Sequence, residues 1–173
     1  MRIEESGKSE PSLCLADYTG TDLTISDLVG EDVPGVVQEL CQVLRNAQRI
    51  PDLLPFYHAV LVREYLVNTV VGSGVAFPHA RLHGIERPCF AFGRSQHPIR
   101  WGSNDCTPVR LVFLSAVPAT DAADYLCLLS ALTRLSKEPA HVEQLKQAES
   151  SAQILAVLKQ VRVRASSPAS LPS

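Results

Sequence analysis

Two segments in the first third of the chain repeat apolar residues at helical spacing. The first begins at Asp32, whose carboxylate can cap free N–H groups before Pro34, and it extends to about Ala47. The second begins at Asp52 and has Arg63-Glu64 in its last turns. This spacing predicts two amphipathic helices. Their expected inner positions are Val33, Val36, Val37, Leu40, Cys41 and Leu44 in the first, and Leu53, Leu54, Tyr57, Val60 and Leu61 in the second.

Apolar runs elsewhere predict the strands of a sheet. Residues 109–117 form the most hydrophobic run, and residues 89–94 alternate apolar and small side chains. A third run, Val75 to Phe77, is expected to end at Pro78, because proline cannot donate a ladder hydrogen bond. The remaining assignments are an edge strand at residues 23–25 and a turn at residues 98–102 around Trp101.

The C-terminal part of the chain predicts three more helices. Asp121 is expected to cap the first, which extends to about Leu135. A shorter helix begins at Lys137-Glu138-Pro139 and ends near Ala148, and Ser150 is expected to cap the last. Their predicted inner positions are Tyr125, Leu128, Leu129 and Leu132 in the first helix, and Ile154, Leu155 and Leu158 in the last.

Length and composition predict one domain. The chain has 173 residues, of which 46% are hydrophobic and 20% charged, as in ordinary globular proteins. We expect the domain at residues 13–164, between disordered ends at residues 1–12 and 165–173. A net charge of -2 gives no electrostatic argument for binding nucleic acid or an anionic membrane. No apolar run reaches the roughly 20 residues of a membrane span, so we predict a soluble, cytoplasmic protein.

The cysteines do not form a recognisable framework. The chain has five, an odd number, and none is part of a C-x-x-C pair, which argues against a disulfide scaffold and a thiolate zinc site. We expect reduced and mostly buried thiols. The alternative is that one of them is reactive. The five are Cys14, Cys41, Cys89, Cys106 and Cys127.

His79 is the strongest candidate for chemistry. It follows a glycine turn at residues 72–74, the apolar run and Pro78, so we expect rigid backbone to hold it where the sheet ends. The ordinary pKa of histidine, about 6.5, leaves a neutral nucleophilic nitrogen abundant at neutral pH. The imidazole can therefore attack an electrophile without a separate base. The alternative is a structural histidine.

The residues around His79 resemble a known phosphorylation site. Arg63-Glu64, Thr69 and the run Gly72-Ser73-Gly74-Val75-Ala76-Phe77-Pro78-His79 are similar to that region of the EIIA components of the phosphoenolpyruvate-dependent sugar phosphotransferase system, fructose/mannitol type, including the nitrogen-regulatory relatives. The resemblance implies an α/β domain with a small mixed sheet flanked by helices. It also implies that His79 accepts phosphate from the phosphocarrier HPr and passes it to an EIIB cysteine, or that a regulatory protein reads the phosphorylated state.

The resemblance assigns roles to other residues. Arg63 is expected to face the phosphorylated histidine, whereas in isolation it would suit the end of its helix. Glu64 is interpreted as a surface or orienting carboxylate. We predict that Thr69, Ser73, Gly74 and Tyr125 contribute to binding the phosphoryl group.

The chain departs from the family pattern at three places. Phe77 stands where a smaller branched residue is usual, and Val70-Val71-Gly72 stands where Gly-(Ile/Val)-Gly is usual. Tyr125-Leu126 matches a His-Leu pair that many members carry. The hydroxyl of Tyr125 could donate a hydrogen bond to a phosphoryl oxygen, but the same residue also falls on the apolar stripe of its helix.

Several other chemistries have weaker support. His79 and His83 have a metal-ligand spacing if the segment is helical, but no third ligand is evident, and we predict neither a metal nor a cofactor. Arg81 is interpreted as a loop charge, or alternatively as a residue that steers an acidic donor. The dinucleotide fingerprint, the hydrolase elbow and the P-loop are all missing, which argues against an ATP-dependent kinase. Two rivals remain: a regulatory binding module, and a relative that has lost phosphorylation.

Overall fold

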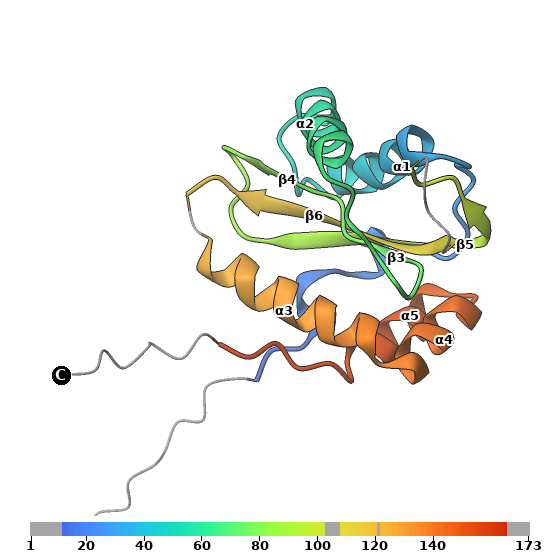
Figure 1. The fold of residues 1–173 in the computed structure, drawn as a ribbon. Coiled ribbons are helices and arrows are strands. Elements are labelled where there is room, and N and C mark those ends of the chain that lie inside the picture. The colour runs from blue at the N-terminus through green and yellow to red at the C-terminus, as the bar shows by residue number, and fades with distance from the viewer. Residues whose placement is uncertain (1–11, 103–107, 121, 166–173) are drawn as a thin grey trace, which may run out of the picture.

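The chain folds around one mixed β-sheet with helices on both faces (Figure 1). The computed structural model describes residues 12–102, 108–120 and 122–165. One face is covered by α1 (Val33–Asn46) and α2 (Leu53–Leu66), and the other by α3 (Ala123–Lys137), α4 (Pro139–Gln147) and α5 (Ser151–Leu158). This confirms the predicted α/β fold with a small mixed sheet. The ends predicted to be disordered lie outside the described residues, except for Ser12 and Ala165.

The long strand β6 (Val109–Pro118) is the centre of the sheet. It pairs antiparallel with β5 on one side and parallel with β3 and β4 on the other. The outer strand β1 is parallel to β5, and β2 is antiparallel to β3. The predicted edge strand at residues 23–25 is confirmed as β1. The bounds are β1 Thr24–Ile25, β2 Val70–Val71, β3 Val75–Ala76, β4 His79–Leu82 and β5 Cys89–Ile99, with short 3-10 turns η1 (Leu15–Tyr18) and η2 (Thr21–Leu23) near the start.

The prediction that the sheet ends at Pro78 is wrong. Ala76 pairs with Val112 before the proline, and His79 pairs with Ser115 after it, so the register on β6 is unchanged. The physical reason is that Pro78 lacks only an N–H group. Its carbonyl still accepts a hydrogen bond from the backbone N–H of Ser115, at 3.0 Å. The pairing with β6 therefore lacks only the hydrogen bond that the nitrogen of Pro78 cannot donate, and it continues as β4.

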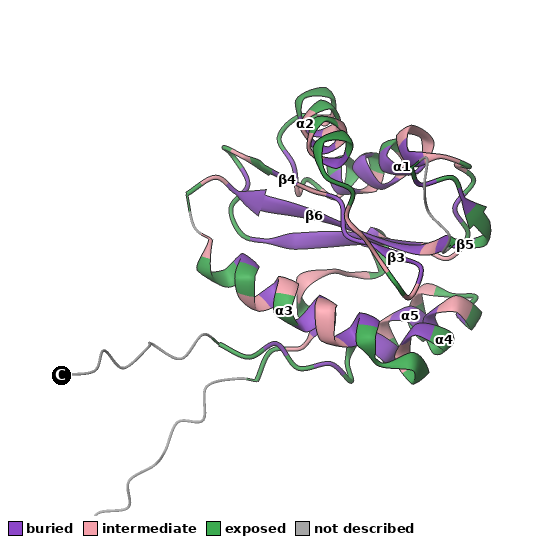
Figure 2. Cartoon of the chain, viewed as in Figure 1, coloured by how far each residue is buried: buried purple, intermediate pink, exposed green. Residues whose placement is uncertain are grey.

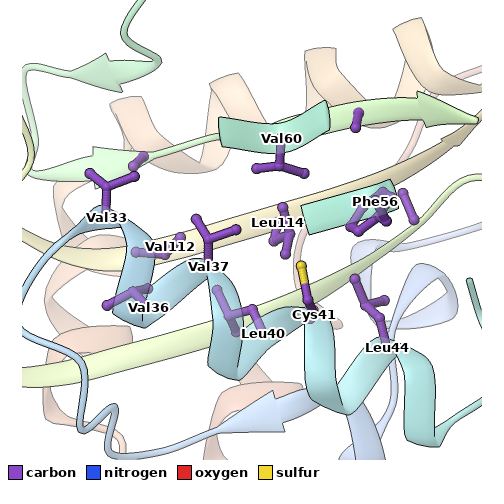
Figure 3. Packing of buried hydrophobic residues seen from close by; sticks show 14 of the residues in the cluster. Val33, Val36, Val37, Leu40, Cys41, Leu44, Phe56, Val60, Val112 and Leu114 are labelled. Atoms are coloured by element: carbon purple, nitrogen blue, oxygen red, sulfur yellow. The ribbon is translucent and has the colours of Figure 1, made fainter. Parts of the chain in front are cut away.

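The face under α1 and α2 confirms one helix prediction and corrects the other. All six predicted inner residues of α1 are buried, and they pack toward the sheet with Phe56 and Val60 of α2 (Figure 3). In α2, however, Leu54 is 73% exposed, and the buried positions are Phe56, Val60 and Glu64. These three are four residues apart and so share one helical face. The prediction included Val60 but not Phe56 or Glu64. Three of its other positions are partly buried against the same core, namely Leu53, Tyr57 and Leu61.

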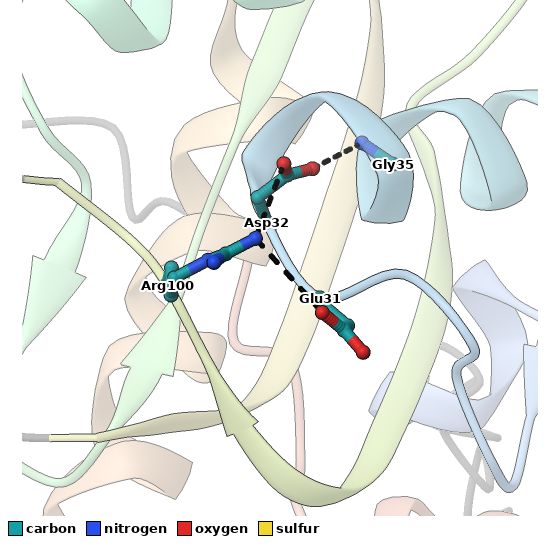
Figure 4. Close-up of polar contacts among 4 residues, drawn as sticks. All are labelled: Glu31, Asp32, Gly35 and Arg100. Carbon is teal, nitrogen blue, oxygen red and sulfur yellow. Dashed lines mark hydrogen bonds and ion pairs between the residues drawn. The ribbon is translucent and has the colours of Figure 1, made fainter.

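The start of α1 is capped as its sequence predicts. An oxygen of the Asp32 carboxylate accepts a hydrogen bond from the backbone N–H of Gly35 at 3.0 Å (Figure 4). The guanidinium of Arg100 lies 3.9 Å from carboxylate oxygens of both Glu31 and Asp32. Because the Arg100 side chain is 75% exposed, these ion pairs contribute little to stability. The cap is the stronger determinant of where this helix begins.

The opposite face is covered by the three C-terminal helices. Their predicted bounds are confirmed within two residues, and Ser150 caps α5 by accepting a hydrogen bond from the backbone N–H of Gln153. Asp121, the predicted cap of α3, lies outside the described residues. The burial pattern separates inward from outward faces on each helix, and β5 and β6 are largely buried between the two helical layers (Figure 2). No helix in the described ranges is long and apolar enough to cross a membrane.

The predicted turn at residues 98–102 is partly wrong. The strand β5 continues to Ile99, which pairs with Val109 after an irregularity in register that begins at Arg94. A proline is tolerated in such an irregular stretch because the ladder is already interrupted. Shortly after the strand, Trp101 is 3% exposed and belongs to the core that includes α1 and α2.

Candidate functional site

His79 begins a strand at an open edge of the sheet. Within the described residues β4 pairs only with β6, and the imidazole of His79 is partly exposed. It lines a hollow of about 300 Å³ together with Ala59, Arg63, Ala80 and Arg81. The fold thus brings two arginines to the candidate nucleophile, one from the last turns of α2 and one from β4. The predicted pair of His79 and Arg63 does share a site.

A backbone contact determines which ring nitrogen of a neutral His79 carries the proton. Its Nδ1 lies 3.1 Å from the carbonyl oxygen of Phe77. A carbonyl oxygen only accepts hydrogen bonds, so Nδ1 must carry the proton that it donates. In the neutral ring the lone pair is then on Nε2. The arrangement leaves Nε2 as the nucleophilic atom and fixes the orientation of the ring.

Arg63 bonds to the end of its own helix and also lines the hollow beside His79. One guanidinium nitrogen donates to the carbonyl of Val67 at 3.0 Å, which satisfies a free acceptor at the end of α2. The same side chain lines the hollow beside His79. Because a guanidinium has five N–H donors, one bond to the helix end leaves donors for an anion. The tether therefore holds the cation near His79.

Tyr125 packs directly against His79. The two ring centroids are 5.7 Å apart with an interplanar angle of 41°, and the Tyr125 side chain is 4% exposed. The guanidinium carbon of Arg81 lies 5.9 Å from the centroid of the Tyr125 ring, within cation–π range. Burial raises the pKa of Tyr125, while the charges of Arg81 and Arg63 lower it. The phenol thus stays neutral at physiological pH in a positive local field.

Glu64 is a buried orienting residue, one of the two roles that the sequence allowed. It is 5% exposed, and its carboxylate accepts hydrogen bonds from the indole of Trp101 at 2.7 Å and from the backbone N–H of Thr69 at 2.8 Å. The hydroxyl of Thr69 also donates to Glu64, and it accepts from the backbone N–H of Phe77 at 3.1 Å. This network ends at the residue whose carbonyl orients His79.

Two predicted binding residues are not brought to the hollow. Ser73 and Gly74 lie in the turn between β2 and β3, where Gly74 adopts the positive φ of 76° that glycine favours. Five residues of extended chain separate Gly74 from His79, which is about 16 Å at strand geometry. Thr69 also does not line the hollow, and its hydroxyl accepts a hydrogen bond from the backbone N–H of Phe77. The structure therefore groups only Tyr125, of the four predicted binding residues, with His79.

The strand β4 argues against two alternatives from the sequence, a metal site formed by His79 and His83 and a loop position for Arg81. The segment from His79 to Leu82 is a strand, so the spacing of His79 and His83 does not place their imidazoles on one helical face. Arg81 was interpreted as a loop charge, but it also belongs to β4. Since alternate residues of a strand share a face, His79 and Arg81 point to the same side. That alternation was the signal in the sequence that would have assigned Arg81 to the site.

Cys14, Cys41 and Cys89 are free thiols in the described part of the chain. Cys41 and Cys89 are buried, which raises the pKa of Cys41 to about 12 and that of Cys89 to about 11. Both are therefore protonated and weakly nucleophilic at neutral pH. Cys14 and Cys127 are partly exposed, and Cys106 lies outside the described residues. The prediction of reduced, mostly buried thiols is confirmed for Cys41 and Cys89.

The buried network gives a first testable prediction. In Glu64→Gln the remaining oxygen can still accept from the indole of Trp101 and the backbone N–H of Thr69, but without the carboxylate charge, and the N–H₂ group replaces the oxygen that accepts from the hydroxyl of Thr69. The hydrogen bonds of the network therefore become weaker. We expect a loss of about 1–3 kcal/mol in the free energy of unfolding, measured by denaturant titration. Glu86→Gln, at an exposed position, serves as the control and should change stability by less than about 0.5 kcal/mol. Equal stability of both variants would contradict the network.

Comparison with known proteins identifies relatives over most of the chain. Residues 18–161 match the family described as "Phosphoenolpyruvate-dependent sugar phosphotransferase system, EIIA 2". A fructose-specific EIIA component of Haloferax volcanii is 35% identical over 127 residues, which are 73% of this chain and 82% of that protein. A nitrogen regulatory protein of Bradyrhizobium diazoefficiens is 36% identical over 102 residues, which are 59% of this chain and 67% of that protein.

Solved structures support the same fold. The crystal structure of the nitrogen regulatory protein IIA-Ntr from Neisseria meningitidis superposes with a TM-score of 0.73, covering 83% of this chain and 98% of that chain. The sequence identity is 23%, so this likeness concerns the fold alone.

Proposed function

The chain belongs to the EIIA 2 family of the phosphoenolpyruvate-dependent sugar phosphotransferase system, and from this we propose that His79 is the residue that carries its phosphoryl group. The observation that carries the proposal is the hydrogen bond from Nδ1 of His79 to the carbonyl of Phe77, in a hollow shared with Arg63 and Arg81. We further propose phosphorylated HPr as the donor, and the cytoplasm as the location, where reducing conditions suit the described free thiols.

The transfer is an in-line displacement at phosphorus. Nε2 of His79 attacks the phosphoryl group, a new P–N bond forms, and the P–N bond to the donor histidine breaks with its electron pair returning to that nitrogen. The proton of His79 stays on Nδ1 throughout, so the site needs no separate base. Arg63 and Arg81 would stabilise the charge on the equatorial oxygens with preorganised donors. Both reacting nitrogens are held by protein, which supplies the required proximity.

The experiment that tests this proposal locates the phosphate and its bond. The full chain is incubated with phosphoenolpyruvate, enzyme I and HPr. We expect one acid-labile phosphate per chain, found on the peptide that contains His79 and bonded to Nε2 in ¹⁵N and ³¹P spectra. A phosphate on Nδ1 of His79 would overturn the orienting role of Phe77. A phosphate on another histidine, or none at all, would overturn the site assignment.

The next acceptor is an EIIB cysteine or a regulatory protein. Both readings have support, since one relative is named a fructose-specific EIIA component and another a nitrogen regulatory protein. The specific observation that favours a regulatory reading is Tyr125. Where many members of the family have a second histidine, this site has a neutral phenol packed on the His79 ring. A phenol offers a hydrogen bond but no positive charge to a phosphohistidine.

Variants at Tyr125 separate its two roles. Tyr125→Phe keeps the ring that packs on His79 and removes the hydroxyl. We expect phosphate still to reach His79, but the rate of phosphorylation by HPr or the lifetime of the product should change about 2- to 10-fold, as for one neutral hydrogen bond. Tyr125→His should change the lifetime further, because it introduces a titratable group. Identical rates and lifetimes in all three proteins would show that Tyr125 is only part of the core.

A further inference from the structure

A second hollow of about 300 Å³ lies beyond the opposite end of α3 from the His79 site. Tyr125 and Arg134 are nine residues apart on this helix, which corresponds to about 13 Å along its axis. The hollow is formed where the end of α3 meets the start of α4 and the segment after α5. The residues that bear on its chemistry are Arg134, Glu138, His141, Gln160, Arg162 and Arg164.

The hollow is lined by several positive charges, although the net charge of the whole chain is not positive. Three of its lining side chains are arginines and one is a carboxylate, while the whole chain has a formal net charge of -2. The two ion pairs found among the described residues both involve Arg100, at a different place in the fold. None of the three arginines forms an ion pair among the described residues, so their like charges are not locally neutralised. A bound anion would neutralise part of this charge.

Two residues that line the hollow each have a buried nitrogen atom without a hydrogen-bond partner among the described residues. These atoms are Nε of Arg134 and Nδ1 of His141. Another guanidinium nitrogen of Arg134 donates to the carbonyl of Arg162, which fixes the position of the side chain. Buried polar groups are nearly always paired, and those of a charged group most of all. The Nε–H of Arg134 is therefore a donor at the wall of the hollow that the described protein leaves unused.

The start of α4 adds a backbone contribution. Glu138 is the N-cap of this nine-residue helix, but its side chain makes no cap hydrogen bond, and His141 is in the first turn. The first N–H groups of a helix and its dipole favour an anion. Arg162 has a different role, because its guanidinium donates to the carbonyl and hydroxyl oxygens of Ser12 and is held by those contacts. Arg134, Arg164 and His141 are therefore the residues left to bind a ligand.

We propose that this hollow binds a small phosphate-bearing anion, of the orthophosphate or diphosphate class, separately from the phosphoryl transfer at His79. Guanidinium groups match the geometry of phosphate oxygens by paired N–H donors. The volume is at the small end of ligand pockets, which suits a compact anion more than an extended cofactor. A bound polyanion would contact α3, the helix that packs Tyr125 against His79.

The test uses the full chain with inorganic phosphate and with pyrophosphate as probes. Both are titrated while the ¹H–¹⁵N spectrum is recorded, in which the Nε–H of Arg134 is observed directly. We expect saturable shifts of that signal and of the backbone N–H of His141. Arg134→Gln should weaken the affinity about tenfold or more, as expected for one charge-assisted contact. Tighter binding of pyrophosphate would assign the diphosphate class, and tighter binding of phosphate the orthophosphate class.

Two control variants make the result specific. Arg45→Gln removes the same charge from an exposed position on α1, on the other face of the sheet, and should bind as the wild type does. His79→Ala should also bind normally, so this proposal and the phosphoryl-carrier proposal fail independently. The absence of saturable shifts would mean that water alone fills the hollow. Equal weakening of phosphate binding by Arg134→Gln and Arg45→Gln would show that binding depends only on the overall charge of the chain. Either result overturns the proposal.

Discussion

Replacing His79 with alanine is expected to eliminate the acid-labile phosphate that the chain acquires from phosphoenolpyruvate, enzyme I and HPr. The reason is that Nε2 of His79 is the atom proposed to form the P–N bond, and no neighbouring group can replace it. Tyr125, the ring packed on His79, has a pKa raised by burial and stays protonated. The measurement is the amount of radioactive phosphate retained at neutral pH and lost in acid.

The matched control for this variant is His83→Ala. His83 is four residues farther along the chain, exposed in the turn after β4, and does not line the hollow around His79. Its variant should be labelled as fast as the wild type. Unfolding midpoints of both variants show whether the fold is intact, and His79→Gln provides a second non-nucleophilic side chain if the alanine variant is unstable. Labelling that persists in folded His79→Ala would refute the assignment.

The sequence predicted the elements of the fold better than their faces. The cap at Asp32, the cap at Ser150 and the apolar stripe of α1 are local signals, and each is confirmed. The strand after Pro78 and the burial of Glu64 on α2 were missed because tertiary contacts decide them. Pro78 keeps its carbonyl bond to β6, which no local rule reveals. Glu64 is buried because Trp101, 37 residues away, donates to it.

The grouping of residues around His79 also depends on contacts between distant segments. His79, Arg63 and Tyr125 come from three separate segments, and the resemblance to a family supplied their association, which periodicity alone could not. Ser73 and Gly74 were included because they belong to the motif that carries the resemblance. Gly74 and His79 are only five residues apart in sequence, but in an extended strand this corresponds to about 16 Å. Arg81, by contrast, lies near His79 because side chains two residues apart in a strand point to the same side of the sheet.

Arg63→Ala is expected to slow phosphorylation of His79 by about 10- to 1000-fold, the range for losing one preorganised charge donor. The guanidinium lines the hollow with His79, so its charge is already in place when the phosphoryl group arrives. The measurement is the single-turnover rate of transfer from phosphorylated HPr. Arg63→Lys should recover only part of this rate, because an ammonium group lacks the paired donors that a phosphoryl group accepts from.

The bond from Arg63 to the carbonyl of Val67 makes a structural control necessary, because losing that bond would loosen the end of α2. Arg45 provides it, since this arginine occupies the last turn of α1 as Arg63 occupies that of α2, but Arg45 does not line the hollow. Arg45→Ala should therefore change stability by a few tenths of a kcal/mol, as for other helix-end charges, and leave the transfer rate unchanged. If Arg63→Ala also transfers at the wild-type rate, the arginine only caps its helix, and Arg81 becomes the cation that stabilises the transferring group.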